Sequence, residues 1–491
     1  MQLPQDVISR IETRSGRMAA AGFLVLCLLL AGFSGNYAFA ALPFALCLVL
    51  LLCSDWRAAW WLLLVGMVVS FDLELSSTLA TSLPDEPLMA VFLFITVLLL
   101  AGRRRLIAED YLRNPLMLIV ALQYVWLVAA VIFSEEPLIS LKFFLAKNWF
   151  MASFFVMPLI IFREKKHFQR AFWLVFLPLL LITAYIFVVH ALKYHFGFRE
   201  IEKAIPDIFY NHVDYGAILS MVLPLIVGAW ALCRRLHLMR LFFTAVILFW
   251  LAAIYFSYAR GAVLAVIFAG GIVLAIRWRL VNWVMPVFYG VIISIIFLLA
   301  HNSRYLDFYP DYDRTYSHET FSDHMIATFR GQDMSSAERI YRWIAAMRMS
   351  KDRPWTGVGP NAFYDYYKPY AVTSFQTWVS RNPERSTTHN YYLFMLVEQG
   401  WPAMILYAIL VVLYFAQAQK VYHRFRDPFW RIITLSVTGV FAAGFINNFF
   451  SELIETHKVG AFYYLSISLL MVLNVISKRQ AAARKAQETL S

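Results

Sequence analysis

The sequence predicts an all-α protein that crosses a membrane about 12–14 times, because runs of roughly 20 apolar residues, the length that spans a bilayer, recur along it. Of its 491 residues, 61% are hydrophobic and only 15% are charged, and the mean hydropathy is +0.62. Soluble domains average about 45–50% apolar and about 25% charged residues. One long polar segment, 301–388, interrupts the apolar runs.

The apolar runs give about 14 candidate spans by this length criterion. Several runs are short, so one or two of them could be re-entrant or merged. The candidates are 18–35, 37–53, 58–71, 87–101, 115–133, 149–162, 171–192, 216–233, 241–257, 262–276, 282–300, 389–415, 429–449 and 459–476. The chain therefore divides into an N-terminal transmembrane bundle (1–300), a loop domain (301–388) and C-terminal transmembrane helices with a tail (389–491).

Basic residues mark alternate connectors. They lie at Arg57, at 103–105, at 163–170, at 234–235, at 277–279, at 424–426 and after Lys478. Basic residues favour the cytoplasmic side of a membrane, so we expect this side, with both termini, to be cytoplasmic. The net charge of +12 is thus explained by topology and does not indicate a nucleic-acid partner.

The opposite, outer side carries the long loop at 301–388, where we expect short helices. Ile340, Trp343, Ile344 and Met347 recur at helical spacing within 335–349, which predicts an amphipathic helix. The Gly-Val-Gly-Pro sequence at 357–360 predicts a turn.

Two cations on the outer side are candidates for phosphate binding. Arg260 lies between two apolar runs, and Lys147 precedes the run at 149–162. Each could simply extend its charge to water from the membrane interface. The alternative is a fixed cation for phosphate oxygens, a role that suits the guanidinium of Arg260 especially well.

His389 and Glu398 mark the span that follows the loop. A histidine facing an outward cavity can accept a proton from an attacking hydroxyl, although a histidine at a helix start can also be a cap. A carboxylate inside a span needs a partner, so Glu398 is either part of the site or holds a neighbouring element.

His212 and Asp214 precede another span and could line the same cavity. The four cysteines form no CxxC or Cys/His ligand spacing, so we expect neither disulfides nor metal. We also expect no cofactor. The sequence also contains no GxSxG nucleophile elbow, P-loop or Rossmann fingerprint.

Three motifs occur in order along 215–415. The first is Tyr-Ala-Arg-Gly-Ala at 258–262. The second is Ser-Ser-Ala-Glu-Arg-Ile-Tyr-Arg-Trp at 335–343, with Pro-Trp-Thr-Gly-Val-Gly-Pro after it at 354–360, and the third is His-Asn at 389–390 with Gly400 after it. With a large outer loop between spans, this pattern resembles the O-antigen ligase and O-antigen polymerase superfamily of GT-C-like bacterial membrane glycosyltransferases.

The resemblance implies a multi-pass protein of the bacterial inner (cytoplasmic) membrane with its active site on the periplasmic side. It implies a metal-independent, inverting transfer of a glycan from undecaprenyl diphosphate to an acceptor hydroxyl. Arg260 matches the family's diphosphate-binding arginine, and His389 matches its catalytic histidine, either as general base or as positioning group. Lys147 stands where the family has another basic residue, and Arg339 matches a loop arginine that clamps phosphate or braces the loop.

We expect the ligase, which moves a finished glycan onto lipid A–core, because a single histidine and one large loop resemble it best. A polymerase joining lipid-linked repeats, or a protein O-oligosaccharyltransferase, would share the donor chemistry. From a different class, a transporter of the lipid-linked glycan would need charged residues at mid-span and inverted-repeat halves; Glu398 is inside a span, but no such symmetry is visible.

Overall fold

The computed structural model describes residues 22, 25–27, 29–30, 38–76, 79–102, 107–233, 237–301, 334–371 and 387–490. Within this part of the chain, 11 helices are long and apolar enough to cross a membrane. The predicted class, an all-α polytopic membrane protein, is confirmed. Most of the predicted first span (18–35), the connectors at 103–105 and 234–235, and the loop segments 302–333 and 372–386 lie outside the described residues.

The long helices follow the predicted runs closely. They are α3 (Ala38–Val69), α4 (Asp85–Gly102), α6 (Pro115–Ile132), α7 (Pro137–Phe150), α9 (Lys165–Tyr194), α11 (His212–Leu232), α12 (His237–Phe256), α13 (Arg260–Arg277), α14 (Val281–Ala300), α16 (Met334–Asp352), α18 (Tyr391–Arg424), α19 (Pro428–Phe449) and α20 (His457–Leu490). Short helical pieces are α5 (Glu109–Leu112), η1 (Met151–Val156), α8 (Met157–Ile161), η2 (Phe198–Glu200), α10 (Ile201–Ala204), α17 (Phe363–Tyr366), η4 (Lys368–Tyr370) and η6 (Leu453–Glu455).

Three local details differ from the predicted spans. The runs 37–53 and 58–71 form the single element α3, whose backbone leaves the helical conformation at Asp55. The predicted connector 134–148 is mostly helical, because α7, η1 and α8 form one continuous span. The predicted connector 72–86 contains an antiparallel hairpin of β1 (Phe71–Ser76) and β2 (Leu79–Leu83), with Phe71 opposite Leu83 and an irregularity between Glu74 and Ser76.

Polar caps fix where several spans begin. The Asn114 side chain accepts from the Leu116 amide at 3.0 Å, and Pro115 occupies the first turn of α6. Asp427 and Pro428 start α19 in the same way. Such caps satisfy amides that have no partner within the helix, and proline is tolerated there because its missing N–H would be unpaired anyway.

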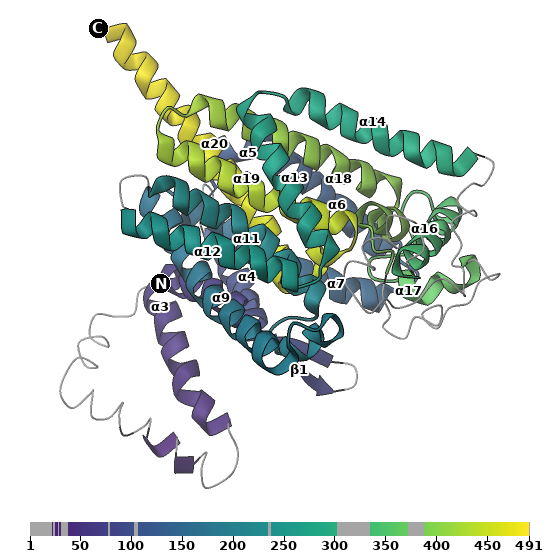
Figure 1. Ribbon diagram of the computed structural model, residues 1–491, viewed down its shortest axis with the longest axis horizontal. Coiled ribbons are helices and arrows are strands. Elements are labelled where there is room, and N and C mark those ends of the chain that lie inside the picture. Colours follow the sequence, from purple (N-terminus) through teal and green to yellow (C-terminus); the bar gives the residue numbers. More distant parts are fainter. Residues whose placement is uncertain are drawn as a thin grey trace.

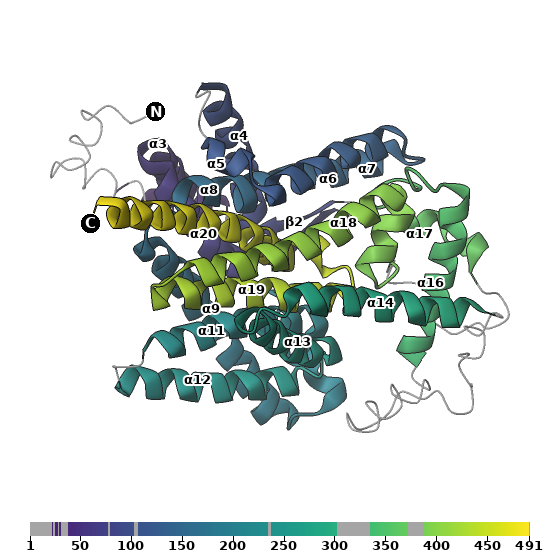
Figure 2. The same ribbon diagram turned by 90° about the horizontal axis from the view of Figure 1, so that it is seen from above.

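The core of the bundle is built around the C-terminal helices. In α20, 89% of the most apolar window is buried, against 72% in α19 and 11% in α14. Helix α19 packs extensively on α11 and α13, and Figures 1 and 2 show α20 passing through the middle of the long helices.

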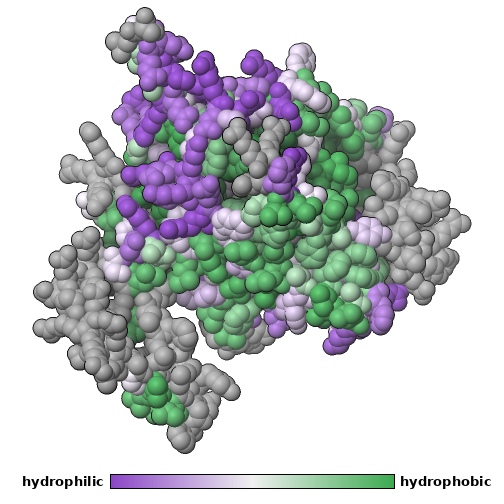
Figure 3. Space-filling model, turned by 60° about the vertical axis from the view of Figure 1, so that its left-hand side comes forward, coloured by the Kyte–Doolittle hydropathy of each residue, from purple (hydrophilic) through white to green (hydrophobic). Residues whose placement is uncertain are grey.

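The bundle has two distinct ends. The loop end carries 387–390, 451–456 and helices α16 and α17, on the right in Figure 1. The basic end carries the connectors 162–164, 278–280 and 425–427 and the protruding part of α20. Figure 3 turns this end toward the viewer and shows hydrophilic side chains gathered around it, next to a broad hydrophobic surface.

The loop folds onto the start of α18. The predicted amphipathic helix is confirmed as α16, and its Ala345, Ala346 and Met349 form a small buried core with Phe363 of α17 and Val397 of α18. This second core holds the loop against the membrane-spanning bundle.

Candidate functional site

His389 occupies a strained position between the loop and α18. Its φ is +50°, a left-handed conformation that costs energy for a residue other than glycine and persists only where the surroundings enforce it. The next residue, Asn390, caps α18 by accepting from the Leu393 amide at 3.1 Å. The Asn390 side chain also donates to the Phe449 carbonyl at 3.0 Å, which ties this turn to the end of α19.

Helix α16 holds the other side of the same turn. The Trp343 indole N–H donates to the Thr388 carbonyl at 2.9 Å, and the Arg342 guanidinium donates to the Thr387 carbonyl at 3.4 Å. The Thr388 hydroxyl donates to the Asn390 carbonyl at 2.9 Å. His389 is therefore positioned by three separate elements, which is the pre-organisation that a reacting group requires.

Burial and the nearby arginine charges both disfavour protonation of His389. Burial, followed by the positive charges of Arg339 and Arg342, lowers the pKa of the His389 imidazole to about 3. The ring is therefore neutral at physiological pH and offers a lone pair to a proton donor.

Glu452 faces the same imidazole and was missed by the sequence analysis. Its Oε2 lies 3.7 Å from His389 Nδ1, which is an ion-pair distance once the ring is protonated but too long for a hydrogen bond. Burial raises the pKa of the Glu452 carboxyl, while the charges of Arg342 and Arg339 act in the opposite direction. The only available signal was that Glu452 lies in the short outer connector 450–458.

Arg260 opens α13 at the same end of the bundle. It follows Tyr258, whose φ is +57° and whose hydroxyl donates to the Phe196 carbonyl. A Cβ placed on the adjacent Gly261 would lie 3.4 Å from Asn447 Oδ1, so the first turn of α13 contacts the end of α19. Because the Asn390 side chain is hydrogen-bonded to Phe449 of the same helix end, the segments that carry Arg260 and His389 both contact the end of α19.

Lys147 lies in a neighbouring buried array. Its ammonium donates to both oxygens of Glu455, at 2.9 and 2.7 Å, and Glu455 also accepts from the Tyr391 hydroxyl at 2.7 Å. The charge of Lys147 is therefore already balanced by Glu455. Lys147 and Tyr391 line a cavity of about 50 Å³ together with Tyr407, Tyr463 and Tyr464.

Glu398 holds the loop rather than facing His389. It is fully buried, and its carboxylate accepts from the amides of Asn361 at 2.6 Å and Phe363 at 3.3 Å. Nearby, Gly400 has a φ of +81°, and a Cβ there would lie 1.9 Å from the Trp355 carbonyl oxygen. The predicted turn at 357–360 is thus docked directly on a break in α18, which supports the structural alternative for Glu398.

His212 and Asp214 have partners of their own. The His212 ring contacts the Glu202 carboxylate through Nδ1. Asp214 is buried in the first turn of α11 and accepts from the Thr456 hydroxyl at 3.4 Å. Both residues lie at the loop end, but these contacts connect them to Glu202 and to the 451–456 connector rather than to His389.

Among the residues that the structure describes, no group of three or more His, Cys, Asp or Glu side chains could hold a metal ion. The charged groups gathered around the turn at 387–390 are instead arginines and carboxylates. This arrangement offers a neutral proton acceptor beside fixed cations, which suits chemistry on an anionic substrate.

Comparison with known proteins gives one family match. Residues 243–408 match the family model described as O-antigen ligase. This match, over about a third of the chain, supports the O-antigen ligase and polymerase superfamily. A search of curated proteins found no match.

The matched region begins in α12 and ends within α18. It therefore contains Arg260, Arg339 and His389 but not Lys147 or Glu452. Members of this superfamily are membrane ligases and polymerases of the glycosyltransferase type, which supports an enzymatic role in general. Lipid-linked glycans and lipid acceptors are the partners that the family implies.

Proposed function

We propose that this protein is an O-antigen ligase of the bacterial inner membrane that transfers a glycan from undecaprenyl diphosphate to a hydroxyl of lipid A–core. The observation that carries the proposal is His389, held between α16 and α18 beside Glu452, in a segment that matches the O-antigen ligase family model. The basic end is then cytoplasmic, with both termini, and the loop end faces the periplasm.

In the proposed reaction, His389 is the general base. Since Nδ1 faces Glu452, Nε2 is the nitrogen that accepts the proton of the acceptor hydroxyl. The acceptor oxygen forms a bond to the anomeric carbon as the bond from that carbon to the diphosphate oxygen breaks, with inversion. The proton stays on the imidazole, and the electron pair of the broken bond leaves with undecaprenyl diphosphate.

The arginines have two effects in this mechanism. Arg260 and Arg339, with Arg342, stabilise the negative charge that develops on the leaving diphosphate, so no metal ion is needed. Before the donor binds, burial lowers the pKa of His389 most, and the positive charges of Arg339 and Arg342 lower it further. The diphosphate neutralises this field, so donor binding raises the pKa of His389 and makes it a stronger base when the acceptor arrives.

Lys147 stays a predicted second phosphate ligand, and for that role the donor must compete with Glu455 for its ammonium. We assign Glu398 to holding the loop, and we assign His212 and Asp214 to supporting the wall of the same end.

Reconstitution with defined acceptors tests the proposal. The purified protein is supplied with an undecaprenyl-diphosphate glycan and, separately, with lipid A–core, a second lipid-linked glycan or a serine-containing peptide. A ligase gives product with lipid A–core alone. Product only with the second glycan would instead indicate a polymerase, and product only with the peptide a protein O-oligosaccharyltransferase.

The metal-free mechanism has a separate test. Transfer should persist in EDTA and fall strongly in Arg260→Ala. Transfer that requires Mg²⁺ and survives Arg260→Ala would contradict it, and glycan movement across the membrane without any transfer product would favour a transporter.

A further inference from the structure

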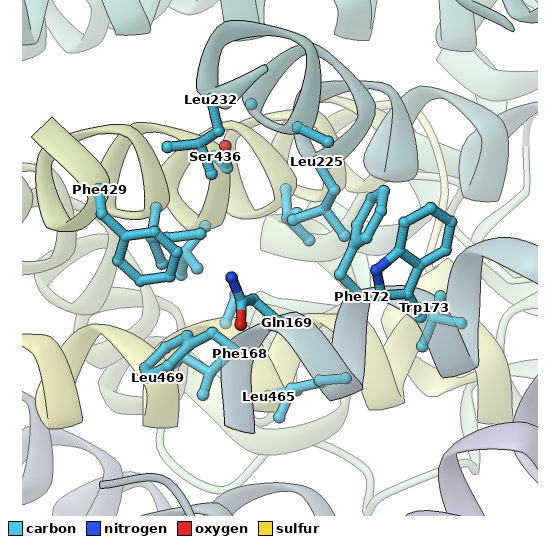
Figure 4. A pocket seen from close by; sticks show the side chains of 18 of the residues that line it. Phe168, Gln169, Phe172, Trp173, Leu225, Leu232, Phe429, Ser436, Leu465 and Leu469 are labelled. Atoms are coloured by element: carbon cyan, nitrogen blue, oxygen red, sulfur yellow. The ribbon is translucent and has the colours of Figure 1, made fainter. Parts of the chain in front are cut away.

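A pocket of about 210 Å³ lies in the half of the bundle nearer the basic end, far along the helices from His389. Helices α9, α11, α12, α19 and α20 line it. Its walls are apolar except for a few groups such as Gln169 and Ser436, and the Gln169 amide points into the space between Phe429 and Leu465 (Figure 4).

The pocket opens on the surface of the membrane-spanning helices. Trp173 of α9, Leu232 of α11 and Met239 of α12 line it and are each more than a third exposed. All three helices are candidate membrane spans. The medium outside the opening is therefore lipid hydrocarbon, and an acyl chain that enters the pocket gains the van der Waals contacts that an empty apolar space lacks.

Three arginines lie close in the sequence to residues that line the pocket. Arg170 follows the lining residue Gln169, Arg240 follows the lining residue Met239, and Arg431 is two residues from the lining residue Phe429. These arginines stack on the rings of Trp61, Trp230 and Tyr422, respectively.

Neither Arg170, Arg240 nor Arg431 forms an ion pair with a carboxylate in the part of the chain that the structure describes, whereas the nearby Lys165 and Lys166 pair with Asp427 and Glu164. These three positive charges, on helices that line the pocket, are therefore not balanced by a carboxylate among the described residues. A phosphate accepts hydrogen bonds from guanidinium groups in a well-matched geometry.

We propose that this pocket binds one acyl chain of an anionic phospholipid, whose headgroup phosphate meets the arginines at its mouth. The apolar walls recognise the chain, and the charge at the mouth selects an anionic headgroup over a zwitterionic one. The bound lipid completes the packing between α9, α12 and α19. This site lies at the opposite end of the bundle from the proposed catalytic site and does not depend on it.

Native mass spectrometry of the full-length, delipidated protein in detergent tests this proposal. The protein is titrated with phosphatidylglycerol and with phosphatidylcholine of the same chain length. We expect one tightly held phosphatidylglycerol, with an affinity at least about fivefold above that of phosphatidylcholine, or about 1 kcal/mol. Equal affinities for the two lipids would overturn the proposal.

Two variants locate the binding. Ala229→Phe places a ring in the pocket, since Ala229 lines it, and Ala121→Phe adds the same ring on the exposed face of α6 as a matched control. We expect Ala229→Phe to weaken phosphatidylglycerol binding about tenfold or more, and Ala121→Phe to leave it unchanged. Equal binding by both variants would overturn the site.

A variant that removes two arginine charges tests the headgroup preference without changing the side chains that line the pocket. Arg170→Gln combined with Arg240→Gln should abolish the preference for phosphatidylglycerol while phosphatidylcholine still binds. A preference that survives this change would refute the role of the arginines. Undecaprenyl phosphate added as a competitor should not displace phosphatidylglycerol. If undecaprenyl phosphate at equal concentration does displace phosphatidylglycerol, the pocket binds the prenyl chain instead.

Discussion

Replacing Glu452 by glutamine removes a negative charge 3.7 Å from His389 Nδ1 while keeping the side chain's size. If His389 becomes an imidazolium during transfer, this charge stabilises the transition state. Two unit charges about 4 Å apart attract by about 4 kcal/mol at an effective dielectric constant of about 20. That value is an upper limit, because burial raises the pKa of Glu452 and both side chains are partly exposed to screening water.

We therefore expect Glu452→Gln to raise the barrier by about 2 kcal/mol, which slows transfer roughly 30-fold. The assay is single-turnover transfer at saturating donor, with donor binding measured separately, because Glu452 acts through His389 and should change the rate and not the donor affinity. Glu200→Gln is the control, since Glu200 lies at the loop end and pairs with Lys203 on the surface. Transfer within about threefold of wild type, or an equal loss of donor affinity, would refute this role of Glu452.

Three further outcomes follow from the site and the loop. An unfolded histidine has a pKa of about 6.5, whereas the pKa of His389 is about 3, so unfolding takes up a proton between these pH values. The free energy of unfolding therefore falls as the pH falls from about 6.5 toward 3. His389→Asn should lose less stability than wild type over this interval, and parallel curves of unfolding free energy against pH for the two proteins would contradict this. Gly400→Ala places a Cβ 1.9 Å from a loop carbonyl oxygen at a φ of +81°. The resulting strain of about 1–3 kcal/mol or more should lower the midpoint of thermal unfolding in detergent. The control Gly290→Ala, where nothing lies within 4 Å of the added Cβ, should leave that midpoint unchanged. Lys147→Met leaves the largely buried Glu455 without its cation, a change that costs up to about 3–5 kcal/mol for a buried pair. Adding Glu455→Gln should recover much of that loss, and purely additive effects in this double-mutant cycle would contradict the coupling.

The membrane-spanning helices could be predicted because their signal is local. A run of apolar residues is long enough to cross a bilayer whatever packs against it, and basic connectors mark the ends. The continuity of α7, η1 and α8 was missed, because polar residues such as Ser140, Lys142 and Lys147 interrupt the apolar run although the backbone stays helical. The β1–β2 hairpin was missed because its strands are short and pair only with each other.

The candidate site was only partly predictable for the opposite reason. His389 and Arg260 lie within ordered motifs, so their residue types and spacing identify them. Glu452 is 63 residues from His389, and its position depends on how the 450–458 connector folds back against the turn at 387–390. The same holds for Glu455, which is 308 residues from Lys147. No local pattern in the sequence indicates which acidic residue of an outer connector meets which basic one.

The central claim is that His389 takes the acceptor's proton and does not hold the donor. The most direct test compares transfer and donor binding in His389→Ala, using the undecaprenyl-diphosphate glycan and lipid A–core in the same detergent. We expect a loss of transfer of about 100-fold or more with donor affinity unchanged. Transfer close to the wild-type rate, or a parallel loss of donor binding, would contradict it.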